Sequence, residues 1–325
     1  MFKIKDLFAH SGRAVVLALA VAAIASTAVA QLSLRKAMDV NGDGRADFTI
    51  YRQTNNIWYT LQSNGASTFT NFGIAGIDYI TPADFDGDGK GDVGVFRELD
   101  GVWFWLNSSN GTFSSFQWGS PGDEALSRDF DGDGKSDVAV VRRSNALMIW
   151  FIYQSSNGQI VQQEFGTAAD FTAPGDYDGD GKIDIAIQRP GLTADSPAVF
   201  HILASSSRTV SAIQWGLSTD LVVPGDYDGD GKTDIAVLRE GKKPSDNLTW
   251  LIRKSSGGTM TEVFGITGID YNVQNDYDGD GKTDIGVFRN ENPGNFYILR
   301  SSDRGVTAIR WGGANDFPVA SYDTH

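Results

Sequence analysis

The sequence predicts an all-β chain folded as a β-propeller, in which four-stranded blades surround a central axis. The first observation is a nine-residue pattern, Asp-x-Asp-Gly-Asp-Gly-Lys-x-Asp, that begins at residues 84, 129, 176, 226 and 276, with a variant copy beginning at residue 39. The second is the spacing of these copies, which is 45 to 50 residues throughout. A period of this length with short strands in each repeat is typical of propeller blades.

Each repeat contains runs that favour strands and no helical periodicity. An apolar run ending in Arg follows the acidic pattern, as in residues 234–239, and an aromatic and β-branched run follows that, as in residues 102–106. A Ser-Ser turn, an alternating strand and an aromatic–Gly pair complete the unit, and a last strand such as 220–227 leads into the next acidic pattern. We expect repeats to begin near residues 34, 79, 124, 171, 221 and 271.

The C-terminal segment 317–323 has the sequence of a first strand without the acidic loop that should follow it. Two arrangements account for it. Either six blades close with this segment lying beside or replacing residues 34–39, or the ring has seven positions of which the last is incomplete. We favour six blades of about 45 to 50 residues in a single domain, residues 31–325.

Residues 1–30 have the features of an export signal. Lys3, Lys5 and Arg13 precede or flank an apolar run, residues 14–24, and Ala28-Val29-Ala30 fits a cleavage site. The apolar run is shorter than the 18 or more residues that a membrane-spanning helix needs. We therefore expect a signal peptide, residues 1–30, and a mature chain that is secreted, periplasmic or on the cell surface, with no stable membrane span.

The composition excludes several classes of protein. The 325-residue chain has a formal charge of -14 and no cysteine, so disulfide scaffolds, thiolate metal sites and cysteine nucleophiles are excluded. The negative charge disfavours nucleic-acid binding. The six acidic patterns hold 23 of the 41 acidic residues but only six of the 27 basic residues. The acidity is therefore a property of these loops rather than of the whole surface.

The spacing within each acidic pattern predicts a calcium loop. Positions one, three and five place oxygens on one side of an extended segment, Gly at position six permits a sharp turn, and position nine returns a fourth carboxylate. Hard oxygen ligands in this number favour Ca²⁺ over Mg²⁺. An EF-hand is excluded because position twelve is always aliphatic rather than Glu. A plain Asp-Gly hairpin turn would explain one copy, but not six alike.

We expect about six structural calcium ions, with dissociation constants on the order of 10⁻⁴ to 10⁻³ M. The side chains at positions one, three, five and nine, together with the backbone carbonyl of position seven, are the expected ligands. They belong to Asp39, Asn41, Asp43, Arg45 and Asp47; Asp84, Asp86, Asp88, Lys90 and Asp92; Asp129, Asp131, Asp133, Lys135 and Asp137; Asp176, Asp178, Asp180, Lys182 and Asp184; Asp226, Asp228, Asp230, Lys232 and Asp234; and Asp276, Asp278, Asp280, Lys282 and Asp284.

The loop pattern, the aromatic–Gly pair and the apolar strand after the loop resemble the FG-GAP or VCBS repeat family, which is related to the integrin α-subunit propeller. The resemblance runs from about Leu34 to the end of the chain. It implies that each loop joins the first two strands of a blade and holds one calcium ion. The literal Gly-Ala-Pro of that family is absent, and integrin propellers have seven blades.

Two further sets of residues recur in the repeats. We interpret one set, Trp58, Trp103, Trp105, Trp150 and Trp250, as core between blades. We interpret the other, Arg52, Arg97, Arg189, Arg239 and Arg289, as repeated salt bridges between blades.

The sequence favours a binding protein over an enzyme. After the signal only His201 and His325 remain as histidines, and the chain has no G-x-S-x-G or H-E-x-x-H motif. We expect a non-catalytic binding or adhesion scaffold for an extracellular protein or a carbohydrate. The alternative is a calcium-dependent polysaccharide-active lyase or hydrolase.

Overall fold

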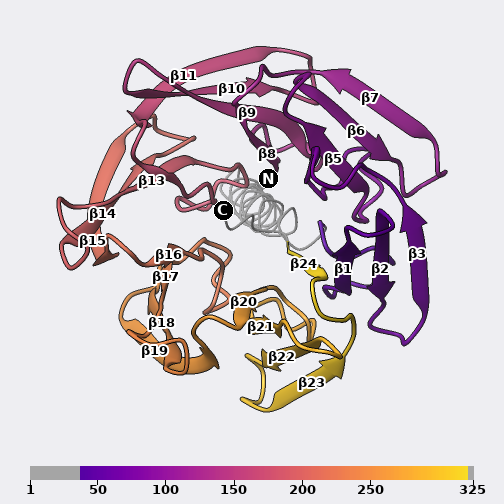
Figure 1. Cartoon of the computed structure of the whole chain (residues 1–325). Helices are drawn as coiled ribbons and strands as arrows, with labels where there is room; N and C mark the ends of the chain where they lie inside the picture. Colours follow the sequence, from indigo (N-terminus) through magenta and orange to yellow (C-terminus); the bar gives the residue numbers. More distant parts are fainter. Residues whose placement is uncertain (1–36, 321–325) are drawn as a thin grey trace, which may run out of the picture.

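Six four-stranded antiparallel sheets form a ring in the computed structural model, which describes residues 37–320 (Figure 1). The expected signal peptide and the last five residues lie outside these described residues. Within the described part, no helix is long and apolar enough to cross a membrane. The chain is thus an all-β propeller with six blades, and the seven-position alternative is wrong.

The blades are numbered along the chain. Blade 1 contains β1 (Phe48–Arg52), β2 (Ile57–Leu61), β3 (Ser67–Asn71) and β24 (Phe317–Val319), and blade 2 contains β4 (Asp78–Ile80), β5 (Val93–Arg97), β6 (Val102–Leu106) and β7 (Phe113–Gln117). Blade 3 contains β8 (Glu124–Arg128), β9 (Asp137–Ser144), β10 (Leu147–Tyr153) and β11 (Ile160–Thr167), and blade 4 contains β12 (Phe171–Thr172), β13 (Ile185–Arg189), β14 (Pro197–Leu203) and β15 (Val210–Leu217). Blade 5 contains β16 (Leu221–Val222), β17 (Ile235–Arg239), β18 (Asn247–Arg253) and β19 (Thr259–Ile266), and blade 6 contains β20 (Asp270–Asn272), β21 (Ile285–Arg289), β22 (Asn295–Leu299) and β23 (Val306–Arg310).

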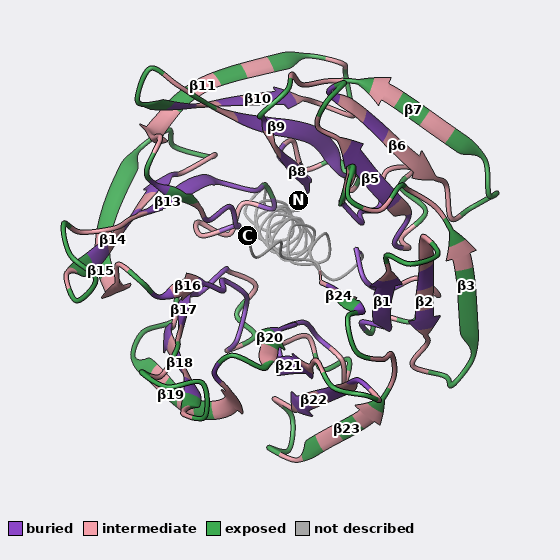
Figure 2. Cartoon of the chain, viewed as in Figure 1, coloured by how far each residue is buried: buried purple, intermediate pink, exposed green. Residues whose placement is uncertain are grey.

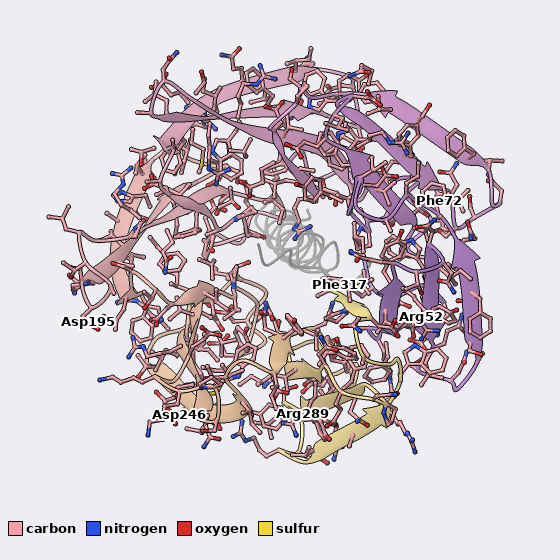
Figure 3. The ribbon with its side chains drawn as sticks, in the orientation of Figure 1. Arg52, Phe72, Asp195, Asp246, Arg289 and Phe317 are labelled. Carbon is pink, nitrogen blue, oxygen red and sulfur yellow. The ribbon has the colours of Figure 1, made fainter. Side chains whose placement is uncertain are left out.

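The C-terminal strand β24 closes the ring. It pairs antiparallel with β1, with Thr49 opposite Val319 and Tyr51 opposite Phe317, and so becomes the innermost strand of blade 1. Figure 3 shows Phe317 on this inner strand and Arg52 beside it in the same blade. Residues 37–39 form no strand, so β24 takes the place expected for residues 34–39.

The innermost strands are shorter than expected. In blade 5, only Leu221 and Val222 of residues 220–227 form a strand, followed by an isolated bridge between Gly225 and Asp234. Pro224 lies between them, and proline has no N–H for a sheet ladder. The same position is Pro82 in blade 2 and Pro174 in blade 4.

The two ends of the ring differ, and we call them the loop face and the strand-start face. The loop face carries the six acidic loops, each of which leads into the second strand of a blade, together with the Ser-Ser turns. In blades 2 to 6 the acidic loop connects the first strand to the second, whereas in blade 1 the first strand is the C-terminal β24. The strand-start face is the opposite end, where the innermost strands begin. The connections after the second strand, including 190–196 and 240–246, also lie at the strand-start face. Asp195 and Asp246 in these two connections project outward in Figure 3.

The core lies between blades and is built mainly from the second and third strands (Figure 2). Trp58, Trp103, Trp150 and Trp250 are 0 to 3% exposed at equivalent positions of the third strand. Each indole donates to the carbonyl of the aromatic residue of the aromatic–Gly pair, in or directly after the outer strand of its own blade. Trp105 does not belong to this set. It lies two residues further along the same strand, is only partly buried, and stacks on Phe85.

The aromatic–Gly pair at the end of each outer strand alternates between Phe and Trp around the ring. Phe72, Phe165 and Phe264 close blades 1, 3 and 5, whereas Trp118, Trp215 and Trp311 close blades 2, 4 and 6. The three indoles donate across a blade interface, to the carbonyls of Phe151, Leu251 and Tyr59 respectively. Indole bridges therefore join blade 2 to 3, blade 4 to 5 and blade 6 to 1.

The recurring Arg at the end of the second strand pairs within its blade, so the prediction of salt bridges between blades was wrong. Arg97 bonds both oxygens of Asp78, at the start of the first strand, at 2.7 and 3.0 Å. The same carboxylate accepts a hydrogen bond from the amide of Ile74, in the connection from the preceding blade. Corresponding pairs are Arg52–Asp316, Arg142–Asp123, Arg189–Asp170, Arg239–Asp220 and Arg289–Asp270.

Candidate metal centres

The carboxylate at position one organises each acidic loop from inside. In the second loop, Asp84 accepts hydrogen bonds from the amides of Gly87 and Gly89 at 2.7 and 3.0 Å. Both glycines have positive φ, 79° and 88°, which side-chain-bearing residues adopt only with strain. The same two bonds recur in the other five loops.

The carboxylate at position nine ties the loop to the neighbouring Ser-Ser turn. Asp92 accepts from the amide of Phe85 at 2.8 Å with one oxygen and from the amide of Ser108 at 2.6 Å with the other. All six loops share this arrangement, with a serine amide from the turn between the third and fourth strands. The turn residues were not foreseen as partners, although their repetition in the sequence was visible.

Three carboxylates converge in five of the six loops. Positions one, three and nine bring oxygens within 4.8 Å of one another in the loops that begin at Asp84, Asp129, Asp176 and Asp276. In the loop that begins at Asp226, the converging positions are one, three and five. Each set can supply three of the oxygen ligands that a hard divalent cation takes.

The position-five carboxylate lies outside four of these clusters. Asp88 accepts instead from the amide of Lys90 and from the hydroxyl of Ser108, both at 2.9 Å. The structure thus brings together three of the four predicted carboxylates in each of these loops. The backbone amide of position seven donates a hydrogen bond to the position-five carboxylate in all six loops.

The first loop differs in charge and in contacts. Asn41 replaces the position-three carboxylate, and its amide nitrogen lies 3.5 Å from Asp47 Oδ1 and 3.4 Å from Ser63 Oγ. Among the described residues, this loop forms no cluster of three carboxylates. It is therefore the weakest candidate for a cation among the six loops.

Burial raises the pKa of the inner carboxyls. The pKa of Asp137 and Asp234 rises to about 7, and that of Asp92 and Asp284 to about 6, chiefly because burial penalises the charged form. Neighbouring carboxylates raise these pKa values further, while backbone amides lower them. A bound cation would offset the cost of burying these negative charges. The chemistry of the donor set therefore fits a divalent metal.

The six loops are joined head to tail by backbone hydrogen bonds. The amide at position eight of one loop donates to the position-one carbonyl of the preceding loop, as Ser136 does to Asp84 at 2.8 Å. The other bonds are Gly91 to Asp39, Ile183 to Asp129, Thr233 to Asp176, Thr283 to Asp226 and Ala46 to Asp276. Because the last of these joins loop one to loop six, the chain of bonds is a closed circle.

The basic side chain at position seven supports the same contacts. The side chain of Lys135 lies over Gly87 of the preceding loop so closely that an added Cβ would be 2.6 Å from its Cε. Lys232 also donates from Nζ to the carbonyl of Asp178 at 2.9 Å. In every loop, the position-four glycine lies against the position-seven side chain of the following loop around the ring. For Gly279 of the sixth loop, that side chain is Arg45 of the first loop. The loop pattern predicted a role only for the backbone carbonyl of position seven, not for its side chain.

The fold and these clusters define a six-bladed β-propeller whose loop face has five carboxylate sets able to hold a metal ion. Residues 39–95 and 129–187 match the FG-GAP-like repeat family. The chain therefore carries FG-GAP-like repeats, as its loop pattern predicted. No curated protein sequence matches it.

Solved structures support the fold. TolB from Acinetobacter baumannii is similar with a TM-score of 0.57 and 14% identity, over 83% of this chain and 64% of TolB, so this chain spans less than two thirds of TolB. AofleA from Arthrobotrys oligospora is similar with a TM-score of 0.52 and 10% identity, over 89% of this chain and 90% of AofleA. At such identities the similarity shows the fold alone.

Proposed function

We propose that this chain is an exported β-propeller that holds calcium in its acidic loops and acts as a non-catalytic binding or adhesion scaffold. The observation that carries the proposal is the convergence of three carboxylate oxygens within 4.8 Å in five loops of one ring. The ligand belongs to the extracytoplasmic space and is a protein or a carbohydrate.

Positions one, three and nine would hold the ion in four loops, and positions one, three and five in the loop that begins at Asp226. Calcium supplies two positive charges to each set of buried carboxylates. The carboxylate at position one keeps the two glycine amides in place, and the one at position nine keeps the Ser-Ser turn against the loop. An ion bound only by the folded loops stabilises the fold by mass action.

Binding rather than catalysis fits the distribution of reactive groups. His201 lies in β14. Burial lowers its pKa most, and the positive charge of nearby Arg189 lowers it further. Among the described residues, the carboxylates that converge in sets of three are the ones in the acidic loops, and their repetition around the ring suits a structural task.

Equilibrium dialysis of the segment 31–325 against millimolar calcium tests the metal part of the proposal. We expect about five bound ions and a weaker sixth, with magnesium failing to replace them at equal concentration. Fewer than three ions would contradict it. Release of reducing ends or unsaturated uronates from any polysaccharide by the calcium-loaded protein would contradict the non-catalytic part.

A further inference from the structure

A pocket of about 710 Å³ opens at the strand-start face, at the end of the ring opposite to the acidic loops. It spans the starts of the innermost strands of blades 2 to 5, and its wall includes Tyr79, Glu124, Arg143, Phe171, Thr219 and Leu221. This size is typical of small-molecule sites. None of the predicted calcium ligands lines it.

Blade 3 breaks the repeat at this pocket. The residue after the first-strand Asp is apolar or aromatic in five blades, namely Tyr79, Phe171, Leu221, Tyr271 and Phe317, but is Glu124 in blade 3. The residue after the second-strand Arg is likewise Arg143 only in blade 3, where the other blades have Gln53, Glu98, Pro190, Glu240 and Asn290. A six-fold ring thus contains one asymmetric site.

The two exceptional residues are bound to each other. Arg143 forms an ion pair with Glu124, and its second terminal nitrogen donates to the carbonyl of Asp170 at 3.2 Å. The other oxygen of Glu124 accepts from the hydroxyl of Thr172 at 2.5 Å. The Glu124 side chain is 9% exposed and that of Arg143 is 33% exposed, so the guanidinium can present its remaining N–H donors to a ligand.

The charges in the wall exclude an anionic ligand. Asp123, Asp170 and Asp220 are each paired with an Arg of their own blade, and Arg143 is neutralised by Glu124. Glu98 is therefore the one wall carboxylate for which the described residues provide no ion pair. A phosphate, sulfate or uronate would meet net negative charge here.

Two exposed aromatic side chains in the pocket wall favour a sugar as the ligand. Tyr79 and Phe171 are 46% and 50% exposed and come from the blades on either side of the Glu124–Arg143 pair. A sugar ring has apolar C–H faces that can lie on aromatic rings and a rim of hydroxyls that both donate and accept hydrogen bonds. Arg143, Glu98 and Thr219 offer the donors and acceptors that such a rim needs.

We propose that this pocket is the ligand site of the scaffold and that it binds a neutral sugar unit of a glycan. The inference rests on the proposed binding function and gives it a place and a ligand class. Phe171 and Tyr79 flank the sugar, and the Glu124–Arg143 pair bonds its hydroxyls. The ligand enters from the strand-start face, while calcium is held at the loop face.

The test is a glycan array probed with the calcium-loaded segment 31–325, with neutral and anionic oligosaccharides on the same array. Hits are then titrated by calorimetry against Phe171→Ala, Tyr79→Ala and Tyr271→Ala. Tyr271 is the matched control because it holds the same strand position in blade 6, is 47% exposed, and lies outside the pocket wall. All three side chains are half exposed, so the variants should fold, and thermal unfolding verifies this.

We expect neutral hits whose affinity falls roughly tenfold or more in Phe171→Ala and Tyr79→Ala and changes less than about twofold in Tyr271→Ala. Hits that survive both pocket substitutions would overturn the site, and hits confined to anionic glycans would overturn the ligand class. An array without hits, from protein that binds calcium, would overturn the proposal while leaving a scaffold with a protein partner. Failure to bind calcium would instead contradict the proposed function itself.

Discussion

The amide of Ala46 donates a 2.7 Å hydrogen bond to the carbonyl of Asp276, although 230 residues separate them in the sequence. This bond joins the first acidic loop to the sixth and completes the circle of six equivalent bonds. It lies at the same interface at which β24 joins blade 1. Strand pairing near the axis and the acidic loops at the loop face thus both close the ring, in addition to the Trp311 bridge from blade 6 to blade 1.

Removal of calcium should destabilise the protein as a whole. At a calcium concentration ten times the dissociation constant, each site adds about 1.4 kcal/mol to the free energy of unfolding. We expect the melting temperature to fall by many degrees in chelator and to recover with added calcium. Thermal unfolding followed by circular dichroism measures it, and an unchanged melting temperature would contradict calcium binding.

Converting the first loop to the common pattern should improve its site. Asn41→Asp adds the missing carboxylate next to Asp39 and Asp47, so the bound calcium should rise by one ion or the weakest affinity should increase several-fold. Equilibrium dialysis measures both. The matched control is Asp86→Asn, which makes the second loop resemble the first and should remove or weaken one site. Equal stoichiometry together with equal affinities in all three proteins would exclude position three as a ligand.

Glycine at position four is needed for two separable reasons. Gly87→Ala imposes positive φ on alanine and also places Cβ 2.6 Å from the Lys135 side chain, whereas Gly89→Ala imposes positive φ with no atom within 4 Å. We expect both to destabilise by about 1 kcal/mol or more, with Gly87→Ala the worse. Denaturant unfolding measures the difference, and Lys135→Ala should reduce the cost of Gly87→Ala but not that of Gly89→Ala.

The intra-blade ion pairs should matter more than the exposed one. Asp170 is 1% exposed and bonded to Arg189, which helps hold the pKa of Asp170 below its usual value against the opposing effect of burial. Arg189→Ala leaves this carboxylate buried without its partner, and we expect a loss of about 2 to 4 kcal/mol in the free energy of unfolding.

Arg300→Ala is the control for that substitution, because its partner Asp303 is 58% exposed. We expect a much smaller loss of stability there, because water screens an exposed ion pair. Equal losses in the two variants would show that the Arg189 pair contributes no more than a surface pair.

The metal-free protein should become more stable as the pH falls. The inner Asp pKa values of about 6 to 7 lie above the unfolded value of about 3.9, so the folded state binds more protons between these limits. Their stabilising contribution is full below about pH 4 and is lost as the pH rises through 7. In chelator we expect a higher melting temperature at about pH 5 than at about pH 8.

Calcium should reverse that trend, because protons and calcium compete for the same carboxylates. Titrating the melting temperature against pH with and without calcium gives two curves of opposite slope over this range. Parallel curves would contradict the assignment of these carboxylates to the metal.

The sequence was sufficient to predict the blades and their acidic loops because the 45 to 50-residue period repeats residues of distinctive chemistry. It was insufficient for contacts made by the backbone. Position eight is Ala46, Gly91, Ser136, Ile183, Thr233 or Thr283, and no side-chain pattern marks the amide that joins the loops. Strand closure was foreseen because residues 317–323 resemble a first strand, but only the structure decides between its two placements.

Two misassignments have simple physical causes. Trp103 and Trp105 point to the same side of one strand, since side chains alternate with a period of two, so aromatic character alone could not separate the buried member from the partly exposed one. The partner of the recurring Arg was missed although it had a signal. An Asp precedes the acidic loop by six residues in blades 2 to 6, as Asp78 precedes Asp84.

The alternation of Phe and Trp in the aromatic–Gly pair gives neighbouring blade interfaces two different chemistries. Interfaces bridged by Trp118, Trp215 and Trp311 alternate with interfaces at which residues 37–320 form no such indole bridge. A rotation of the ring by one blade would therefore superimpose each bridged interface on an unbridged one. A rotation by two blades would superimpose bridged interfaces on bridged ones. With respect to these indole bridges, the repeating unit of the ring is a tandem of two blades.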